Sequence, residues 1–142
     1  MDEKRINELK ITATKVRMHV IEGTFNAKSG HPGGSLSIAD VITYLYCEKM
    51  NVDANNPRNP ERDRFVLSKG HCAPALYGIL AEKGYFDAEE IKSLRHIGSM
   101  LQGHPDMNKT PGVDMSTGSL GQGISAACGM ALAGKIDNKD YK

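Results

Sequence analysis

The chain has 142 residues, of which 39% are hydrophobic and 25% are charged, and its formal net charge is +1. This length suits one domain with a real hydrophobic core, and a charge so close to zero leaves no excess for binding nucleic acid. No apolar run approaches the roughly 18 residues that span a bilayer, and the charged amino terminus MDEKRINELK is not a secretory signal. We therefore expect a cytoplasmic protein that binds neither nucleic acid nor membranes.

The cysteines and histidines do not have the spacing of a metal site. Cys47, Cys72 and Cys128 are odd in number and widely separated, and no CxxC or H-x₃₋₅-H pattern is present. Such thiols are typical of a reducing compartment. We expect no metal ligand among these residues.

The first predicted element is a helix from residue 3 to about residue 27, because apolar side chains recur at helical spacing from Ile6 to Val20. The segment SGHPGGS then breaks this helix, since proline and paired glycines interrupt regular structure. A second helix is expected after Ser37, because Ser-Ile-Ala-Asp has the form of a capping box.

A polar, proline-containing loop separates this helix from the only convincing strand. Residues 64–68, RFVLS, are short and apolar and lead directly into Gly70-His71. A helix is predicted to begin right after this glycine, because Cys72, Leu76 and Ile79 share one helical face. In α/β proteins, ligand-binding groups are placed at such a junction of strand, glycine turn and helix.

Three further segments complete the chain. Asp87 is predicted to cap a short helix that carries Ile91 and Leu94. Residues 95 to about 119 form a polar loop, whose length is typical of functional or disordered segments. Residues 120 to about 135 are predicted to form a helix of small side chains, which lets a neighbouring backbone or a ligand approach closely.

This balance of elements predicts an incomplete α/β fold. Helices are plentiful, yet the single strand does not supply the sheet that the helices should cover. We expect the helix-rich front portion of a larger unit, in which a parallel sheet flanked by helices lies largely outside these residues.

Three of the five histidines directly follow a glycine: His31 in SGHPGGS, His71 in SKGHCAP and His104 in QGHPDM. Imidazole donates from one nitrogen, accepts at the other and titrates near neutrality, so three of them at one cleft would suit hydroxyl binding and proton transfer. The alternative is that they are turn histidines whose glycines merely supply a positive φ. His19 and His96 are expected to be ordinary surface or hydrogen-bonded histidines.

A glycine-rich run, TGSLGQG from Thr117 to Gly123, precedes the small-residue helix. Bare backbone amides at a helix start can hold an anion or another ligand. The spacing matches neither GxGxxG nor the P-loop. Close helix packing with a tight turn explains the run equally well.

Taken in order, SGHPGGSLS, RDRFVLSKGH and QGHPDMNKTPGVDMSTGSLGQGIS closely resemble the amino-terminal part of transketolase. The resemblance covers nearly the whole chain, and LSKGH and STGSLGQG are most similar to the forms built from two separate polypeptides. Ser119 is a departure, since single-chain members more often have proline there. The resemblance implies that residues 1–142 are the amino-terminal part of the family's diphosphate-binding domain.

The activity that this resemblance implies is thiamine diphosphate-dependent ketol transfer. A two-carbon glycolaldehyde unit moves from a ketose phosphate to an aldose phosphate, with Mg²⁺ or Ca²⁺ holding the cofactor's diphosphate. By similarity, His31 and His104 contact substrate hydroxyls and assist proton transfer, and His71 lies beside the diphosphate and the reacting centre. The aminopyrimidine is expected against Gly118, Ser119 and Leu120.

The resemblance also implies a partner. The family's metal motif, Gly-Asp-Gly…Asn, is expected on a strand that would follow Lys142, and the activating glutamate belongs to a separate pyrimidine-binding domain. We therefore expect a carboxyl-terminal transketolase subunit or a second protomer, in a dimer or heterotetramer.

Two alternatives remain open at this point. One is an enzyme similar to 1-deoxyxylulose-5-phosphate synthase, which also has a GHPGG-like loop. RDRFVLSKGH and GHPDMNKTPGV favour transketolase over this relative. The other alternative is an inactive truncated fragment with only an assembly role.

Overall fold

The computed structural model describes all 142 residues. Its first element, α1, runs from Glu3 to Ala27, as the sequence predicts. Asp2 caps the helix by accepting a hydrogen bond from the backbone N–H of Arg5, and Lys28 ends it in the left-handed conformation with φ 48°. Ala13, Val16 and Val20 are buried on one face of α1, because apolar side chains at helical spacing share one side.

The segment after α1 differs from the prediction in detail. Instead of an irregular break, it contains a short helix, α2 (Pro32–Leu36), which begins at a proline as helices often do. The predicted capping box at Ser37 is wrong, because this residue ends α2 and its Oγ donates to the carbonyl of Gly34. The next helix, α3 (Ala39–Tyr44), starts without a side-chain cap and continues as the π-helical turn η1 (Leu45–Lys49).

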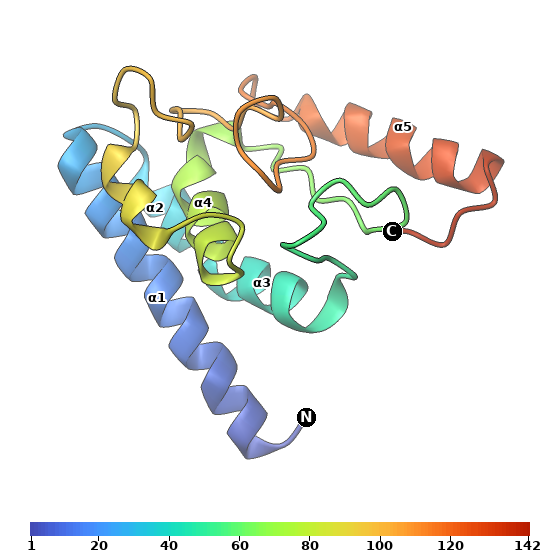
Figure 1. The fold of residues 1–142 in the computed structure, drawn as a ribbon, viewed down its shortest axis with the longest axis horizontal. Coiled ribbons are helices and arrows are strands. Elements are labelled where there is room, and N and C mark those ends of the chain that lie inside the picture. Colours follow the sequence, from blue (N-terminus) through green and yellow to red (C-terminus); the bar gives the residue numbers. More distant parts are fainter.

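Helix α4 (Ala73–Glu82) lies at the centre of the hydrophobic core. The 3₁₀ turn η2 (Gly70–Cys72) leads into it, which confirms the predicted helix after Gly70-His71. Leu76, Tyr77, Ile79 and Leu80 are all buried, and a helix that is apolar all round belongs inside the protein. Helices α1, α2 and α3 pack around α4, together with the 3₁₀ helix η3 (Ala88–Ser93) (Figure 1). Asp87 caps η3, as predicted, by accepting from the N–H of Glu89.

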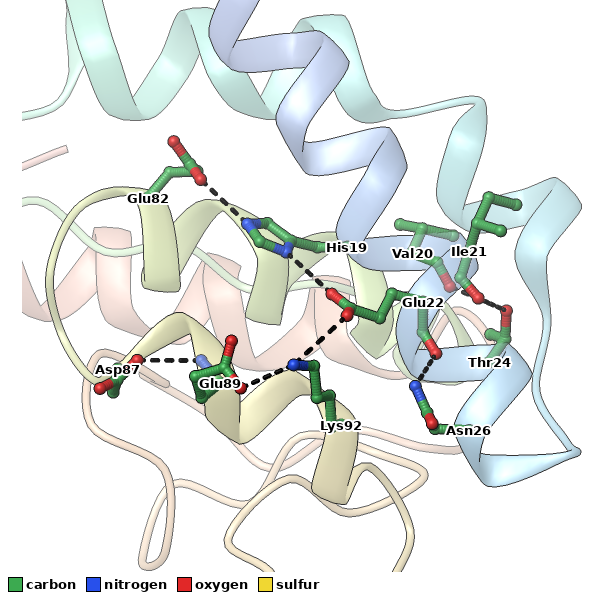
Figure 2. Close-up of polar contacts among 10 residues, drawn as sticks. All are labelled: His19, Val20, Ile21, Glu22, Thr24, Asn26, Glu82, Asp87, Glu89 and Lys92. Carbon is green, nitrogen blue, oxygen red and sulfur yellow. Dashed lines mark hydrogen bonds and ion pairs between the residues drawn. The ribbon is translucent and has the colours of Figure 1, made fainter.

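His19 joins α1 to α4 (Figure 2). Its Nε2 lies 2.9 Å from Glu82 Oε1, and Lys15 Nζ lies 3.1 Å from the other oxygen of the same carboxylate. On the other side of the ring, Nδ1 is 3.9 Å from Glu22 Oε2. His19 is therefore a hydrogen-bonded packing residue, as the sequence predicts.

The predicted strand at residues 64–68 is not formed, because no other segment provides a β ladder beside it. The N–H of Arg64 donates to the carbonyl of Lys142, and the N–H of Phe65 donates to Asp114 Oδ2. One acceptor is the backbone carbonyl of Lys142 and the other is a carboxylate side chain, whereas the N–H groups of a β-strand donate to the backbone carbonyls of a neighbouring strand. The segment has no regular secondary structure, although Leu67 within it is buried.

Helix α5 (Gly123–Ile136) lies apart from the helices around α4, and α1 and α5 occupy opposite sides of the view in Figure 1. It rests on the irregular segment instead: a Cβ at Gly123 would lie 2.9 Å from Ser68 Cα. Its outer side is open, with Ile124, Leu132 and Ile136 each more than half exposed. No helix in the structure combines the length and the apolar character needed to cross a bilayer.

Candidate active site

The His31 segment is fixed from two sides. Gly30 turns the chain after α1 with a φ of 135°, a value that L side chains rarely adopt. The Oγ of Ser35, a buried residue, donates to the carbonyl of His31 at 2.9 Å, and Lys69 Nζ donates to the carbonyl of Gly34 at 2.6 Å. The imidazole of His31 is exposed and has no hydrogen-bonding partner in the chain. The backbone is thus held while the ring stays available.

His71 lies directly beside His31. The two ring centroids are 5.1 Å apart and the planes meet at 69°. This approach depends on Gly34, because a Cβ there would lie 2.6 Å from the sulfur of Cys72 and something would have to move. The glycines of SGHPGGS therefore let its backbone pack against the SKGHCAP turn.

The SKGHCAP turn also contacts the TGSLGQG segment. A Cβ at Gly70 would lie 2.6 Å from the carbonyl carbon and oxygen of Thr117. Ser68 strengthens this contact, since its carbonyl accepts from the N–H of Gly121 at 2.9 Å and its Oγ accepts from the N–H of Ile124 at 3.2 Å. The start of α5 is therefore positioned by the residues immediately before His71.

The backbone of His104 is fixed by a hydrogen bond from α4. The hydroxyl of Tyr77 lies 2.9 Å from the carbonyl of Gln102 and 3.1 Å from that of His104. Burial raises the pKa of Tyr77 far above its ordinary value, so the phenol remains a donor over the whole physiological range. The exposed ring of His104 faces Gly118, where a Cβ would lie 3.6 Å from its Cγ and Cδ2.

These contacts bring the three Gly-His pairs, at His31, His71 and His104, into one region. His31 meets His71, the turn of His71 meets Thr117, and the neighbouring Gly118 meets His104. The rings of His31, His71 and His104 have no hydrogen bond or ion pair within the chain, in contrast to His19. The turn-only alternative explains Gly30, which has a positive φ, but it does not explain Gly70 and Gly103, which do not. Gly70 and Gly103 serve close contacts instead.

Ser119 and Leu120 present open groups next to this region. Both are exposed, Leu120 to 70%. The backbone N–H groups of Gly118, Ser119 and Leu120 donate to no acceptor in the chain, and Thr117 Oγ1 is buried without a hydrogen-bonding partner. Unpaired donors beside an exposed aliphatic side chain fit a flat heteroaromatic ring that carries acceptors. The residues present are therefore compatible with the aminopyrimidine of thiamine diphosphate.

Sequence reasoning missed several residues that hold this region together. Lys69 donates to the carbonyl of Gly34, and Tyr77 donates to the carbonyl of His104. Arg95 contacts the segments of both His31 and His104. Lys69 lies within the SKGHCAP motif, so the sequence indicated it. Tyr77 and Arg95 belong to no motif or spacing pattern that would indicate a role at the site. No group of three or more histidine, cysteine, aspartate or glutamate side chains lies close enough together to hold a metal ion.

Comparison with known proteins identifies the family of the chain. The family described as "Transketolase, thiamine diphosphate binding domain" matches residues 8–142. A 6-deoxy-6-sulfo-D-fructose transketolase subunit of a Clostridium species is 51% identical over 138 residues, which are 97% of this chain and 50% of that protein. One of the subunits of the apulose-4-phosphate transketolase of Phocaeicola vulgatus is 44% identical over 97% of this chain and 49% of its own length. Mouse transketolase is 47% identical over 99% of the chain and 23% of its own length.

Solved structures agree. Transketolase from Leishmania mexicana superposes with a TM-score of 0.85 at 37% identity, over 88% of this chain and 19% of that one. A Pichia stipitis transketolase complex with sedoheptulose-7-phosphate gives 0.83 at 36% identity, over 88% and 18%. The chain is thus similar in sequence to the thiamine diphosphate-binding domain of transketolases and in fold to the corresponding part of solved transketolases. The chain belongs to the transketolase family, and it spans about half the length of its two subunit relatives.

Proposed function

We propose that this chain supplies the amino-terminal part of a thiamine diphosphate-dependent transketolase, which moves a glycolaldehyde unit from a ketose phosphate to an aldose phosphate. The observation that supports this most directly is the meeting of His31, His71, His104 and Gly118 in one region whose imidazoles have no internal partner. When bound, thiamine diphosphate supplies the nucleophilic carbon and stores the negative charge during transfer. The protein supplies position and proton transfer.

In this proposal the exposed rings of His31 and His104 bind sugar hydroxyls and move protons at the substrate's oxygen atoms. Both are reachable from solvent, which suits groups that contact a substrate rather than the core. His71 is half-buried beside His31, and in the proposal it lies beside the diphosphate and the reacting centre. A neutral imidazole can donate to one oxygen atom and accept from another, so each ring can hold a hydroxyl and exchange its proton.

The cofactor's aminopyrimidine lies against Gly118, Ser119 and Leu120 in this proposal. Their free N–H groups donate to ring acceptors, and the Leu120 side chain covers an apolar edge. Proline has no backbone N–H, so the donor at Ser119 is one that members with proline at this position lack, and the N–H groups of Gly118 and Leu120 are the donors common to both. The diphosphate is held by Mg²⁺ or Ca²⁺, whose ligands come from outside residues 1–142.

The rest of the active site belongs to a partner, either a carboxyl-terminal transketolase subunit or a second protomer. Two relatives are named as subunits, and the chain covers about half of each. We infer an α/β sheet completed by further chain, in which residues 64–68 become a strand once a neighbouring strand supplies the ladder. A cytoplasmic location fits the three free cysteines, and we infer a dimer or heterotetramer because the proposed site is shared with a partner.

The experiment is a ketol-transfer assay of the assembled enzyme with His31→Ala and His104→Ala. Each substitution should lower turnover by about 10²-fold or more, while the affinity for thiamine diphosphate stays near that of the wild type. His96→Ala is the matched control, because this exposed histidine has no part in the site. Unchanged turnover in both variants would remove the proposed roles. Pyruvate consumption with CO₂ release would instead favour the synthase, and assembly without any activity would favour a purely structural chain.

A further inference from the structure

Arg95 adopts a backbone conformation that its surroundings must impose. Its φ is 62°, in the left-handed region that long side chains rarely occupy, at a cost of about 1 kcal/mol. The N–H of Arg95 donates to the carbonyl of Leu101 at 2.8 Å, which closes residues 95–101 into a small loop after η3. This closure sets the direction in which the side chain leaves the backbone.

The guanidinium of Arg95 touches the segments of two different histidines. Its Nη1 lies 3.2 Å from Ser29 Oγ, two residues before His31. On its other side it lies against Gly103, the residue before His104, where a Cβ would be 2.9 Å from Cζ, 3.0 Å from Nη2 and 3.1 Å from Nε. One planar group thus spans the space between the two segments.

Space, and not backbone conformation, explains the glycine at position 103. Its φ is not in the left-handed region, so an alanine could adopt the same backbone. A methyl group there would collide with the guanidinium. Arg95 also forms no ion pair with any carboxylate, so its position is set by Ser29, Gly103 and its own backbone.

The two segments share no direct hydrogen bond. The His31 segment is tied to Lys69, and the His104 segment is tied to Tyr77. No hydrogen bond joins residues 28–35 to residues 101–105. The guanidinium therefore bridges the two segments, in addition to the indirect route through His71 and the Thr117–Gly118 segment.

We propose that Arg95 is a positioning residue, which sets the distance between His31 and His104 by holding Ser29 on one side and Gly103 on the other. The proposal rests on the proposed function, since the distance matters because both imidazoles would act on one sugar. A displacement of about 1 Å in such groups can reduce a rate by about 10²-fold. Arg95 itself need not touch the substrate.

The first test is spectroscopic and uses the assembled protein with ¹⁵N-labelled histidine. Ring signals are assigned by their loss in His31→Asn and His104→Asn variants. Arg95→Ala should shift the ring signals of both His31 and His104, while His19, held between α1 and α4, should not change. Unchanged signals of His31 and His104 would overturn the proposal, whether or not the protein has transketolase activity.

The second test is a double-mutant cycle between Arg95→Ala and Gly103→Ala. Arg95→Ala should lower kcat by about 10-fold to 10²-fold and leave the cofactor's Kd unchanged. Gly103→Ala adds a methyl group against the guanidinium and should cause a similar loss by displacing it. In the Arg95→Ala background the added methyl group meets no guanidinium, so the double variant should be no slower than Arg95→Ala alone.

Additive losses in this cycle would overturn the proposal, because they would mean that Gly103 acts independently of Arg95. Arg58→Ala is the matched control, since this exposed arginine forms no ion pair and no hydrogen bond with the segments of His31 and His104. If Arg95→Ala fails to fold, Gly103→Ala alone still decides through the histidine signals. A wild-type protein without ketol transfer contradicts the proposed function, and the spectroscopic result remains a separate measurement.

Discussion

At the scale of single residues, a buried carboxylate determines how the loop before the site is held. Asp114 accepts from the N–H of Phe65 at 2.7 Å and pairs with Arg62. Arg62 in turn donates to the carbonyls of Pro57 and Asp63. Asp114 therefore ties the loop of residues 107–114 to the irregular segment that leads to His71. Replacing it by alanine leaves a mostly buried guanidinium without its partner, which typically costs about 3–5 kcal/mol.

The titration of Asp114 gives a prediction with a definite sign. Burial outweighs the Phe65 N–H and Arg62 and raises the pKa of Asp114 above its ordinary 3.8. The folded protein therefore keeps this proton at pH values where the unfolded chain has released it, and the contribution of Asp114 to the free energy of unfolding falls as the pH rises through that interval. Asp114→Asn does not titrate. The stability of the wild type relative to this variant should thus decrease with rising pH.

Urea denaturation of both proteins between about pH 3.5 and pH 6 measures this difference. Working with the difference removes the contributions of the other carboxylates, which titrate in both proteins. A wild-type advantage that grew as the pH rose would contradict the raised pKa.

At the scale of elements, glycine has opposite roles in α4 and α5. Gly78 lies where α4 crosses α1, and a Cβ there would be 3.3 Å from His19 Cβ and from the carbonyl oxygen of Val16. Gly129, in the exposed middle of α5, has no atom within 4 Å of its missing Cβ. The first glycine permits a close helix crossing, whereas the second only weakens the helix that contains it.

The two glycines therefore form a matched pair for the same substitution. Alanine at either position gains up to about 1 kcal/mol of helix propensity. Gly78→Ala should nevertheless lower the free energy of unfolding, by about 1–3 kcal/mol, because the methyl group overpacks the contact with α1. Gly129→Ala should raise it by about 0.5–1 kcal/mol. Thermal and urea unfolding measure both, and a stabilised Gly78→Ala would show that α1 and α4 do not cross this closely.

At the scale of the whole molecule, two apolar surfaces remain open. On α1, Met18 is 65% exposed and Phe25 is 78% exposed. On α5, Ile124 and Ile136 are 61% and 69% exposed. Exposed apolar surface of this extent is typical of sites where further protein packs. It agrees with a chain that spans about half of its subunit relatives.

Cofactor binding is the corresponding prediction at this scale. The isolated chain should bind thiamine diphosphate weakly or not at all, because in the proposed function the N–H groups of residues 118–120 form only one wall of the cofactor site and the metal ligands come from outside residues 1–142. Isothermal calorimetry with Mg²⁺ measures this, with circular dichroism of the same sample as a check that the helices are formed. The assembled enzyme is the positive control. Tight Mg²⁺-dependent binding by the isolated chain would contradict the proposed division of the site.

Helices α1, α4 and η3 were determined by local sequence. The bounds of α1, the start of α4 after Gly70-His71 and the cap at Asp87 follow from side-chain spacing and capping chemistry, which act over a few residues. The resemblance that the three motifs carry also identified the family. By contrast, the predicted strand at residues 64–68 failed because a strand depends on a distant partner, and local composition does not reveal whether one is present.

Only the tertiary structure decided which residues meet. His31 and His71 are neighbours because Gly34 lets two turns approach, and His104 faces Gly118 because Tyr77 holds the loop from α4. The contacts of Arg95 also depend on tertiary structure, because this residue reaches Ser29, which is far away in the chain, as well as Gly103. Such contacts depend on how the elements pack against one another, so neither residue spacing nor a local motif in the sequence predicts them.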